Sequence, residues 1–178
     1  MRQIVTKMSE VILNLTIEDQ RWCEAIADMT QVAEKVKAAA FGYLQTHENL
    51  GILKSEKPLG INVCLSNDAT VQQLNKQFRG MDKPTNVLSF ANLDFENFAS
   101  ENEPFAEIEL GDIIVAYETM VREAEAENIT LYAHFCHLLT HGFLHILGFD
   151  HMTDEEAEYM ERVEKEILQS IGIDNPYE

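Results

Sequence analysis

The sequence has 178 residues and a mass of 20.3 kDa, a size that suits one compact domain. Its 13 basic and 31 acidic residues give a formal net charge of −18. This excludes a protein that binds nucleic acid through a general basic surface, because such binding depends on many Lys and Arg contacts with phosphates. A nucleic-acid substrate remains compatible with the charge only through a local basic patch or a metal ion.

No apolar run approaches the roughly 20 residues that cross a bilayer, and residues 1–7 lack the apolar region and cleavage site of a secretory signal. We therefore expect a soluble, cytoplasmic protein with no membrane partner. Cys23, Cys64 and Cys136 are far apart and form no CxxC pair, which favours neither a disulfide framework nor a thiolate metal site.

Residue patterning predicts a small mixed sheet of about four strands packed with about five helices. The expected strands cover residues 11–17, 59–65, 86–90 and 107–115. The expected helices cover residues 19–46, 117–128, 131–147 and 154–171, and one more follows the cap residues 66–68 and runs through Phe78. Residues 91–106 are expected to form a mobile loop. Because strands and helices do not strictly alternate, the fold class is α+β, with one domain over residues 1–178.

Five of the six histidines lie between positions 134 and 151. His141 and His145 are four residues apart, so on a helix they project from one face and both can reach an ion at about 2.0–2.1 Å. Gly148 can adopt a left-handed conformation that ends the helix, and the turn then returns His151 as a third ligand. A lone pair with this spacing is often coincidental or a satisfied core pair, but the third histidine in this register indicates one bound metal ion, for which we expect Zn²⁺.

Three histidines and a water form an open, catalytic type of zinc site, since a closed structural site needs four protein ligands. The spacing matches that of metzincin peptidases, whose general base is a glutamate directly after the first histidine. Here that position is Gly142, which cannot move a proton. Nickel and copper also suit imidazole ligands, so the pattern does not name the physiological metal.

Neighbouring residues are candidates for supporting roles. His137 lies one turn before His141 on nearly the same face and is a candidate catalytic residue. It would either support the ligand histidines or contact the substrate. His134 is expected to be packed or on the surface. Asp150 either orients a ligand imidazole or caps the next segment.

A local basic patch interrupts the acidic sequence at Lys76, Arg79 and Lys83. Arg79, beside Gly80, can offer its planar guanidinium to a phosphate, although a salt bridge to one of the many carboxylates is the more common use of such a residue. The glutamates of the last helix are interpreted as a solvated face: Glu155, Glu156, Glu158, Glu161, Glu164 and Glu166.

Several motifs follow one another along the chain: Asn75, Arg79-Gly80, Asp82, the run from Pro84 to Phe90, the run from Leu110 to Ile113, and the histidine motif from His141 to His151. Taken together, they resemble those of the bacterial YbeY family, in collinear order from about Leu59 to Ile171. The chain departs from the family at Asn86, where Asp is frequent, and at Ala91, where Pro usually follows the Ser-Phe pair.

The resemblance implies a metal-dependent single-strand endoribonuclease that acts in 16S rRNA maturation, at the 3′ end, and in ribosome quality control. By similarity, the fold is α+β with a zincin-like site, His141, His145 and His151 are zinc ligands, and Arg79 is the key basic residue of the cleft. His137 coincides with a further histidine common in the family. The implied partners are ribosomal RNA and the small ribosomal subunit, including the protein uS11 and the GTPase Era.

Two other functions remain compatible with the residues. A zinc peptidase or amidohydrolase needs a carboxylate near the metal water, supplied from outside position 142. A non-catalytic ribosome assembly factor would use the metal only to hold the C-terminal helices, and a fourth protein ligand would indicate that role. For a nuclease, proton transfer is open among His137, Asp112 and the activated water. The charge of −18 predicts weak activity without partners on the ribosome.

Overall fold

The computed structural model describes residues 9–94 and 106–177, which form four strands and six α-helices. The expected mobile loop falls mostly on residues 95–105, outside the described residues, as do residues 1–7. The strands are β1 (Val11–Ile17), β2 (Leu59–Ser66), β3 (Val87–Ala91) and β4 (Ile108–Ala116). The helices are α1 (Arg21–Ala25), α2 (Met29–His47), α3 (Asp68–Arg79), α5 (Tyr117–Glu127), α6 (Leu131–Ile146) and α7 (Asp154–Ser170). The predicted single α+β domain with a mixed four-stranded sheet is confirmed.

The sheet has the order β1-β2-β4-β3, in which β1, β2 and β4 are parallel and β3 runs antiparallel at one edge. Gly111 lets β3 and β4 approach closely. Its φ is +153°, and a Cβ atom there would lie 2.2 Å from the carbonyl oxygen of Phe90. Only glycine fits such a close backbone contact, so the glycine in the Leu110–Ile113 motif fixes the position of the edge strand.

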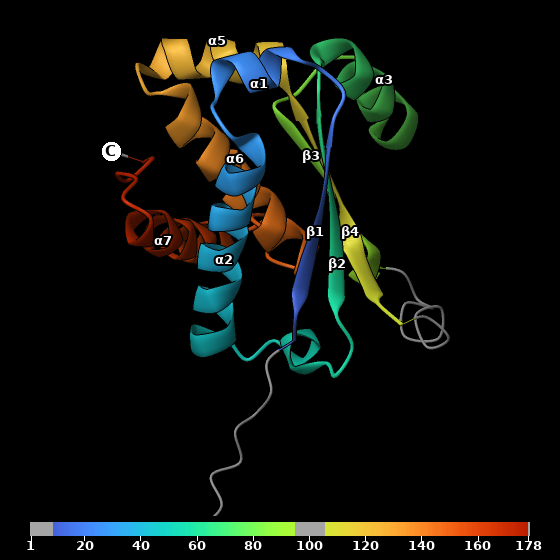
Figure 1. Ribbon diagram of the computed structural model, residues 1–178, viewed down its shortest axis with the longest axis vertical. Coiled ribbons are helices and arrows are strands. Elements are labelled where there is room, and N and C mark those ends of the chain that lie inside the picture. Colours follow the sequence, from blue (N-terminus) through green and yellow to red (C-terminus); the bar gives the residue numbers. More distant parts are fainter. Residues whose placement is uncertain (1–8, 95–105, 178) are drawn as a thin grey trace, which may run out of the picture.

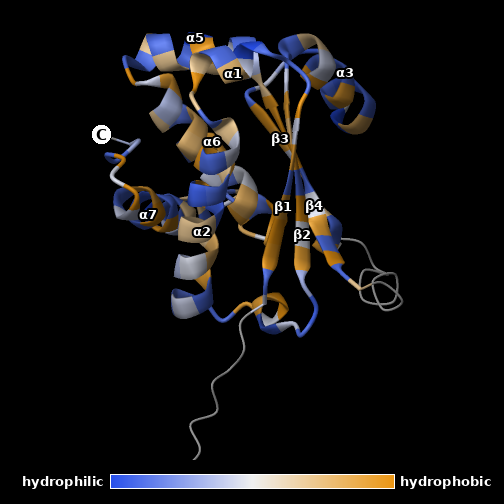
Figure 2. Cartoon of the chain, viewed as in Figure 1, coloured by the Kyte–Doolittle hydropathy of each residue, from blue (hydrophilic) through white to orange (hydrophobic). Residues whose placement is uncertain are grey.

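The two faces of the sheet are covered unequally (Figure 1). Helices α2 and α6 lie on one face, and α3 lies against part of the other. Figure 2 shows the strands as mostly hydrophobic and the helices as mixed. The larger core lies between the sheet and the α2–α6 layer, and Trp22 is fully buried there, with edge-on contacts to Tyr117 and Phe135. A smaller core under α3 consists of Val71, Leu88, Ile114 and Ala116.

The expected helix over residues 19–46 is wrong in one respect, because the chain divides it into α1 and α2. Asp28 has a left-handed backbone with φ of 53°, and its side chain accepts a hydrogen bond from the N–H of Gln31 as the N-cap of α2. Asp is a favoured N-cap residue and tolerates this conformation. None of the helices in the described ranges is long and apolar enough to cross a membrane.

Candidate metal centre

Three imidazoles converge at the C-terminal end of α6. His141 and His145 lie one turn apart on this helix, which ends at Ile146. Gly148 then takes a φ of +93°, as expected for a helix-ending glycine, and the turn brings His151 back toward the other two. The available ring nitrogens of the three histidines lie within 4.8 Å of one another. The structure therefore brings the three predicted ligands together.

The orientation of the rings fits a shared cation. His145 donates its Nδ1–H to the carbonyl oxygen of Phe149 at 3.0 Å, and His141 Nδ1 lies 2.6 Å from Glu164 Oε1. The two Nε2 atoms face each other at 2.9 Å. In the neutral tautomers that carry the proton on Nδ1, both Nε2 lone pairs are directed into the same space, an arrangement that suits a bound cation. Within the described part of the chain the cluster offers three candidate ligands, the number typical of an open site.

Burial also favours the neutral form of His145. Burial, together with the charges of His141 and His151, lowers the pKa of His145 to about 4. A histidine binds a metal only in its neutral form. His145 is therefore ready to bind an ion at neutral pH without first losing a proton.

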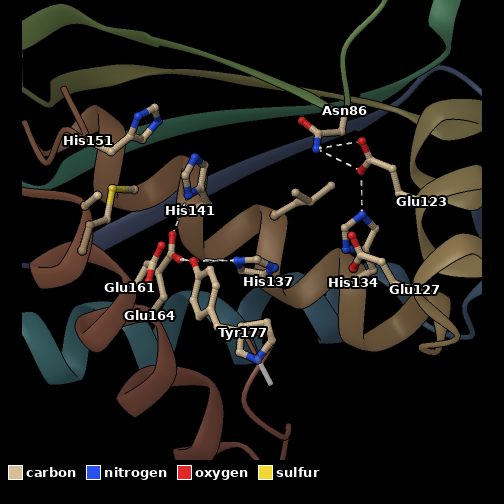
Figure 3. A pocket seen from close by; sticks show the side chains of 14 residues that line it. Asn86, Glu123, Glu127, His134, His137, His141, His151, Glu161, Glu164 and Tyr177 are labelled. Carbon is tan, nitrogen blue, oxygen red and sulfur yellow. Dashed lines mark hydrogen bonds and ion pairs between the residues drawn. The ribbon is translucent and has the colours of Figure 1, made fainter. Parts of the chain in front are cut away.

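Glu164 corrects the prediction that all glutamates of α7 form a solvated face. Its side chain is fully buried, and it contacts His141, His137 and Tyr177 (Figure 3). Burial alone would raise the pKa of Glu164, but the hydrogen bonds from His137, His141 and Tyr177 outweigh it and lower that pKa to about 2. A carboxylate that accepts the second N–H of a ligand histidine fixes its tautomer and orientation. A signal was present in the sequence, since position 164 lies four residues after Met160 and three before Ile167, within the apolar stripe of α7.

His137 and His134 contact different neighbouring residues. His137 Nε2 lies 3.3 Å from Glu164 Oε2 and 3.2 Å from the hydroxyl of Tyr177. His134 is buried, as one of the expected outcomes, and its Nε2 lies 2.8 Å from Glu123. Glu123 in turn accepts a hydrogen bond from the side-chain amide of Asn86 at 2.9 Å (Figure 3). Asn86 stands at a position where we expected Asp to be frequent, and here its amide binds a carboxylate.

Arg79 lies on the same pocket as the three histidines. This pocket has a volume of about 450 Å³, and Asn86 and Ser89 also line it. The guanidinium of Arg79 is exposed and donates to the carbonyl oxygen of Ser89 at 3.3 Å, so its hydrogen bond goes to a carbonyl and not to a carboxylate. Gly80, with φ of +69°, ends α3 directly after it. Sequence order alone could not place Arg79 beside the histidines, because they lie on elements more than 60 residues apart.

The two other candidates, Asp150 and Asp112, lie at different places. Asp150 lines the same pocket as the three histidines, where it accepts a hydrogen bond from the backbone N–H of His151 at 2.8 Å. Its negative charge partly offsets the lowering of the pKa of His145. Asp112 projects from β4 into a separate groove, where Asn62 donates to it at 2.9 Å.

The fold is a single α+β domain in which α6 and the turn after it bring three imidazoles together. These features define a class of proteins with a candidate three-histidine metal site. Comparison with known proteins identifies the family within this class. The family model described as endoribonuclease YbeY matches residues 16–172. The chain therefore belongs to the YbeY endoribonuclease family, whose members are hydrolases that act on RNA.

Individual relatives are similar over nearly their whole length. An endoribonuclease YbeY of Paramagnetospirillum magneticum is 44% identical over 156 residues, which are 88% of this chain and 89% of that protein. One of Rhizobium etli is 40% identical over 171 residues, 96% of this chain and 95% of that protein. A solution structure of a protein from Thermotoga maritima shares the fold, with a TM-score of 0.53, 21% identity, and coverage of 90% of this chain and 91% of that one.

Proposed function

We propose that the chain is a zinc-dependent single-strand endoribonuclease that acts in the cytoplasm on 16S rRNA, in maturation of its 3′ end and in ribosome quality control. The observation that carries the proposal is one pocket that holds three converging imidazoles and an exposed guanidinium. Membership of the YbeY endoribonuclease family supports an RNA phosphodiester as the substrate. The small ribosomal subunit, with uS11 and the GTPase Era, is the proposed setting.

His141, His145 and His151 would hold the ion. When bound, a zinc ion supplies Lewis acidity that activates water near neutral pH and polarises a phosphoryl oxygen. The protein's own contribution is orientation. Glu164 and the carbonyl of Phe149 hold the Nδ1 atoms of His141 and His145, which keeps both Nε2 lone pairs directed to the same point.

Arg79 is the proposed partner of the scissile phosphate. Its guanidinium offers several N–H donors in a plane, which match two non-bridging oxygens. Negative charge builds on these oxygens as the bond to phosphorus forms, and a fixed positive charge lowers the energy of that state more than the energy of the bound substrate. The bond to the Ser89 carbonyl holds the side chain toward the pocket.

Proton transfer is assigned in this proposal to His137 or to the activated water. His137 lines a second pocket, of about 440 Å³, that also contains His141 and His151. Asp112 is a poor candidate because it lines a different groove. The hydrogen bonds of His137 with Glu164 and Tyr177 would orient its ring for this role.

The two alternative functions receive less support. The buried carboxylate nearest the cluster, Glu164, is fully engaged by His137, His141 and Tyr177, so it is not free to act as the base of a peptidase. An assembly factor with a structural metal would have four protein ligands, whereas the cluster in residues 9–94 and 106–177 has three.

The test is cleavage of a single-stranded RNA oligonucleotide by purified protein, with the metal content measured on the same sample. We expect cleavage with about one zinc ion per chain, loss on chelation and recovery when zinc is added back. A matched RNA duplex serves as the control and should be cleaved much more slowly. Cleavage that survives complete removal of metal, or zinc-loaded protein without cleavage, would contradict the proposal.

A further inference from the structure

The pocket that holds Arg79 and the three histidines is called the metal pocket below. Beside it lies a largely apolar groove on the opposite face of the sheet. Its volume is about 450 Å³, within the range of small-ligand sites of roughly 300–1,000 Å³. It is bounded by α3 and crosses β2, β4 and β3. The side chains that matter here are Cys64, Leu74, Phe78, Phe90, Asn62 and Asp112.

The two hollows share a wall, the edge strand β3. Successive side chains of a strand point to opposite faces. Val87, Ser89 and Ala91 line the metal pocket, whereas Phe90, and Asn92 just after the strand, line the groove. In the part of the chain that the structure describes, β3 is the edge strand of the sheet. A single-stranded polymer that passes around this edge would contact both hollows.

Arg79 and Phe78 connect the two hollows from the end of α3. Arg79 lines the metal pocket, and its Cζ lies 6.0 Å from the centroid of the Phe90 ring. Phe78 lines the groove and meets Phe90 edge-on, with ring centroids 5.4 Å apart. A phosphate on Arg79 would therefore lie next to an aromatic pair.

Phe78 has an exposed fraction of 61%, the highest of the aromatic side chains among the described residues. It continues the face of α3 that carries Val71 and Leu74, but Val71 is fully buried whereas Phe78 lies past the smaller core. Its ring contacts Phe90 in a T-shaped arrangement, and most of its surface is open to solvent. Single-stranded RNA is typically bound by bases that stack on such rings.

The rim of the groove favours a base over a phosphate. Asn62 donates to Asp112 at 2.9 Å and lies 3.4 Å from Glu109, so carboxylates border this end. Burial, with the charges of Glu107 and Asp112, raises the pKa of Glu109, a sign of crowded negative charge. Phosphates would be repelled here, whereas a neutral base would meet apolar walls. Cys64 adds to them, because burial raises its pKa to about 11 and keeps the thiol neutral.

We infer that this groove is a base-binding subsite, in which Phe78 stacks on an unpaired RNA base next to the phosphate that Arg79 holds. The inference rests on the proposed function and extends it, because it says how an acidic chain gains affinity for RNA. Stacking needs no positive charge and tolerates every base. It gives affinity for single strands without sequence preference and excludes a duplex, whose bases are already stacked.

The test combines a change in the protein with a change in the RNA. Kinetics are measured on an oligonucleotide with one dominant cleavage site, and on variants in which each nucleotide flanking that site is replaced in turn by an abasic one. For the wild type, one abasic position should raise KM on the order of 10-fold with little change in kcat. Phe78→Ala should raise KM by a similar factor on the intact RNA and make that position insensitive to loss of the base.

Two controls separate stacking from a structural effect. Phe78→Trp keeps a flat ring and should retain the low KM and the sensitivity to the abasic position. Ile129→Ala removes a side chain of 37% exposure from another surface and should leave KM unchanged. If Phe78→Ala keeps the wild-type KM, or if its response to every abasic position equals that of the wild type, the subsite is disproved.

The outcomes also separate this inference from the proposed function. If the wild type does not cleave RNA when loaded with zinc, the proposed function fails. If the wild type cleaves and Phe78→Ala behaves identically, only the base subsite fails. A Phe78→Ala variant with unchanged RNA kinetics but weaker binding of a lysine-rich peptide would show that the groove docks a basic protein, and that result also overturns the inference.

Discussion

The carboxylate of Glu164 on α7 lies 2.6 Å from Nδ1 of His141 on α6. This contact joins α7 to the three-histidine cluster and fixes which nitrogen of His141 faces the other imidazoles. The same carboxylate accepts hydrogen bonds from His137 and Tyr177. Two side chains of α6 and one near the C-terminus are thus held around one buried negative charge.

Removal of that charge should weaken metal binding. We expect Glu164→Gln to lower zinc affinity by about 10- to 100-fold, as is typical when the partner of a ligand histidine is lost. Competition with a chromophoric zinc chelator measures the change. Glu158→Gln, an exposed position on the same helix, is the matched control and should bind zinc like the parent. Equal affinities for all three proteins would show that Glu164 does not orient His141.

Replacement of Arg79 should affect catalysis and leave stability intact. The side chain is exposed and its hydrogen bond goes to a single carbonyl, so the free energy of unfolding of Arg79→Ala should stay within about 0.5 kcal/mol of the parent. Its kcat should fall by roughly 10²- to 10³-fold, the usual cost of losing a group that stabilises transition-state charge. Lys76→Ala, on the same helix, is the control. The assigned role is wrong if Arg79→Ala cleaves RNA as fast as the parent.

A side chain at position 142 should destabilise the protein. Gly142 packs against β4, and a Cβ there would lie 3.0 Å from both Cδ1 and Cγ2 of Ile113, which is fully buried. We expect Gly142→Ala to cost about 1–3 kcal/mol through overpacking, partly offset by the roughly 1 kcal/mol that alanine gains over glycine in a helix.

The contact with Ile113 can be tested by a double mutant. Ile113→Val removes Cδ1, so its own cost and that of Gly142→Ala should not add in the double variant. Urea unfolding of the four proteins gives the interaction free energy. Simple additivity would mean that Gly142 is not required by this contact.

The contribution of Asp68 to stability should depend on pH. Its side chain accepts hydrogen bonds from the N–H and hydroxyl of Thr119 and from Arg122, which joins α3 to α5. Burial alone would raise the pKa of Asp68, but these hydrogen bonds prevail and lower it below its ordinary value of 3.8. Because the folded pKa lies below the unfolded one, the stabilisation is present above the unfolded pKa and disappears as pH falls through the folded pKa.

Asp68→Asn should therefore be less stable than the parent by about 1–2 kcal/mol at pH 7, and the difference should shrink progressively below about pH 4. Chemical unfolding at a series of pH values measures it. Asp174→Asn, at an exposed position outside the helices, should show no such trend. A difference for Asp68→Asn that stays constant down to pH 2 would contradict the assignment.

Local patterns predicted the elements well. The alternation of residues 11–17 gave β1 with the observed bounds, and the ends of α6 and α7 lie within one residue of those expected. Each depends on contacts between near neighbours in sequence, such as the capping box of Thr153 and Glu156. The break between α1 and α2 was missed, because it lies between Ala25 and Met29, where no Gly or Pro marks it. Ile26 is buried there and Asp28 takes a left-handed backbone.

Relationships across the fold were harder to infer. The i, i+4 spacing of His141 and His145 is local, so the cluster could be anticipated. The burial of Glu164 depends on how α7 packs on α6, 23 residues from its partner His141, and glutamate is rarely buried. The proximity of Arg79 to the histidines depends on the edge position of β3, which is set by the close approach at Gly111.

Trp22, the sole tryptophan of the chain, gives the protein a built-in optical probe. Its indole N–H donates to the carbonyl of Ser66, and its ring meets Tyr117 and Phe135. Elements from the beginning, middle and later parts of the chain therefore surround one fluorophore that water does not reach. Its emission should shift to longer wavelength only when this shared core opens, so one fluorescence trace reports the unfolding of every variant above except Phe78→Trp, which adds a second tryptophan.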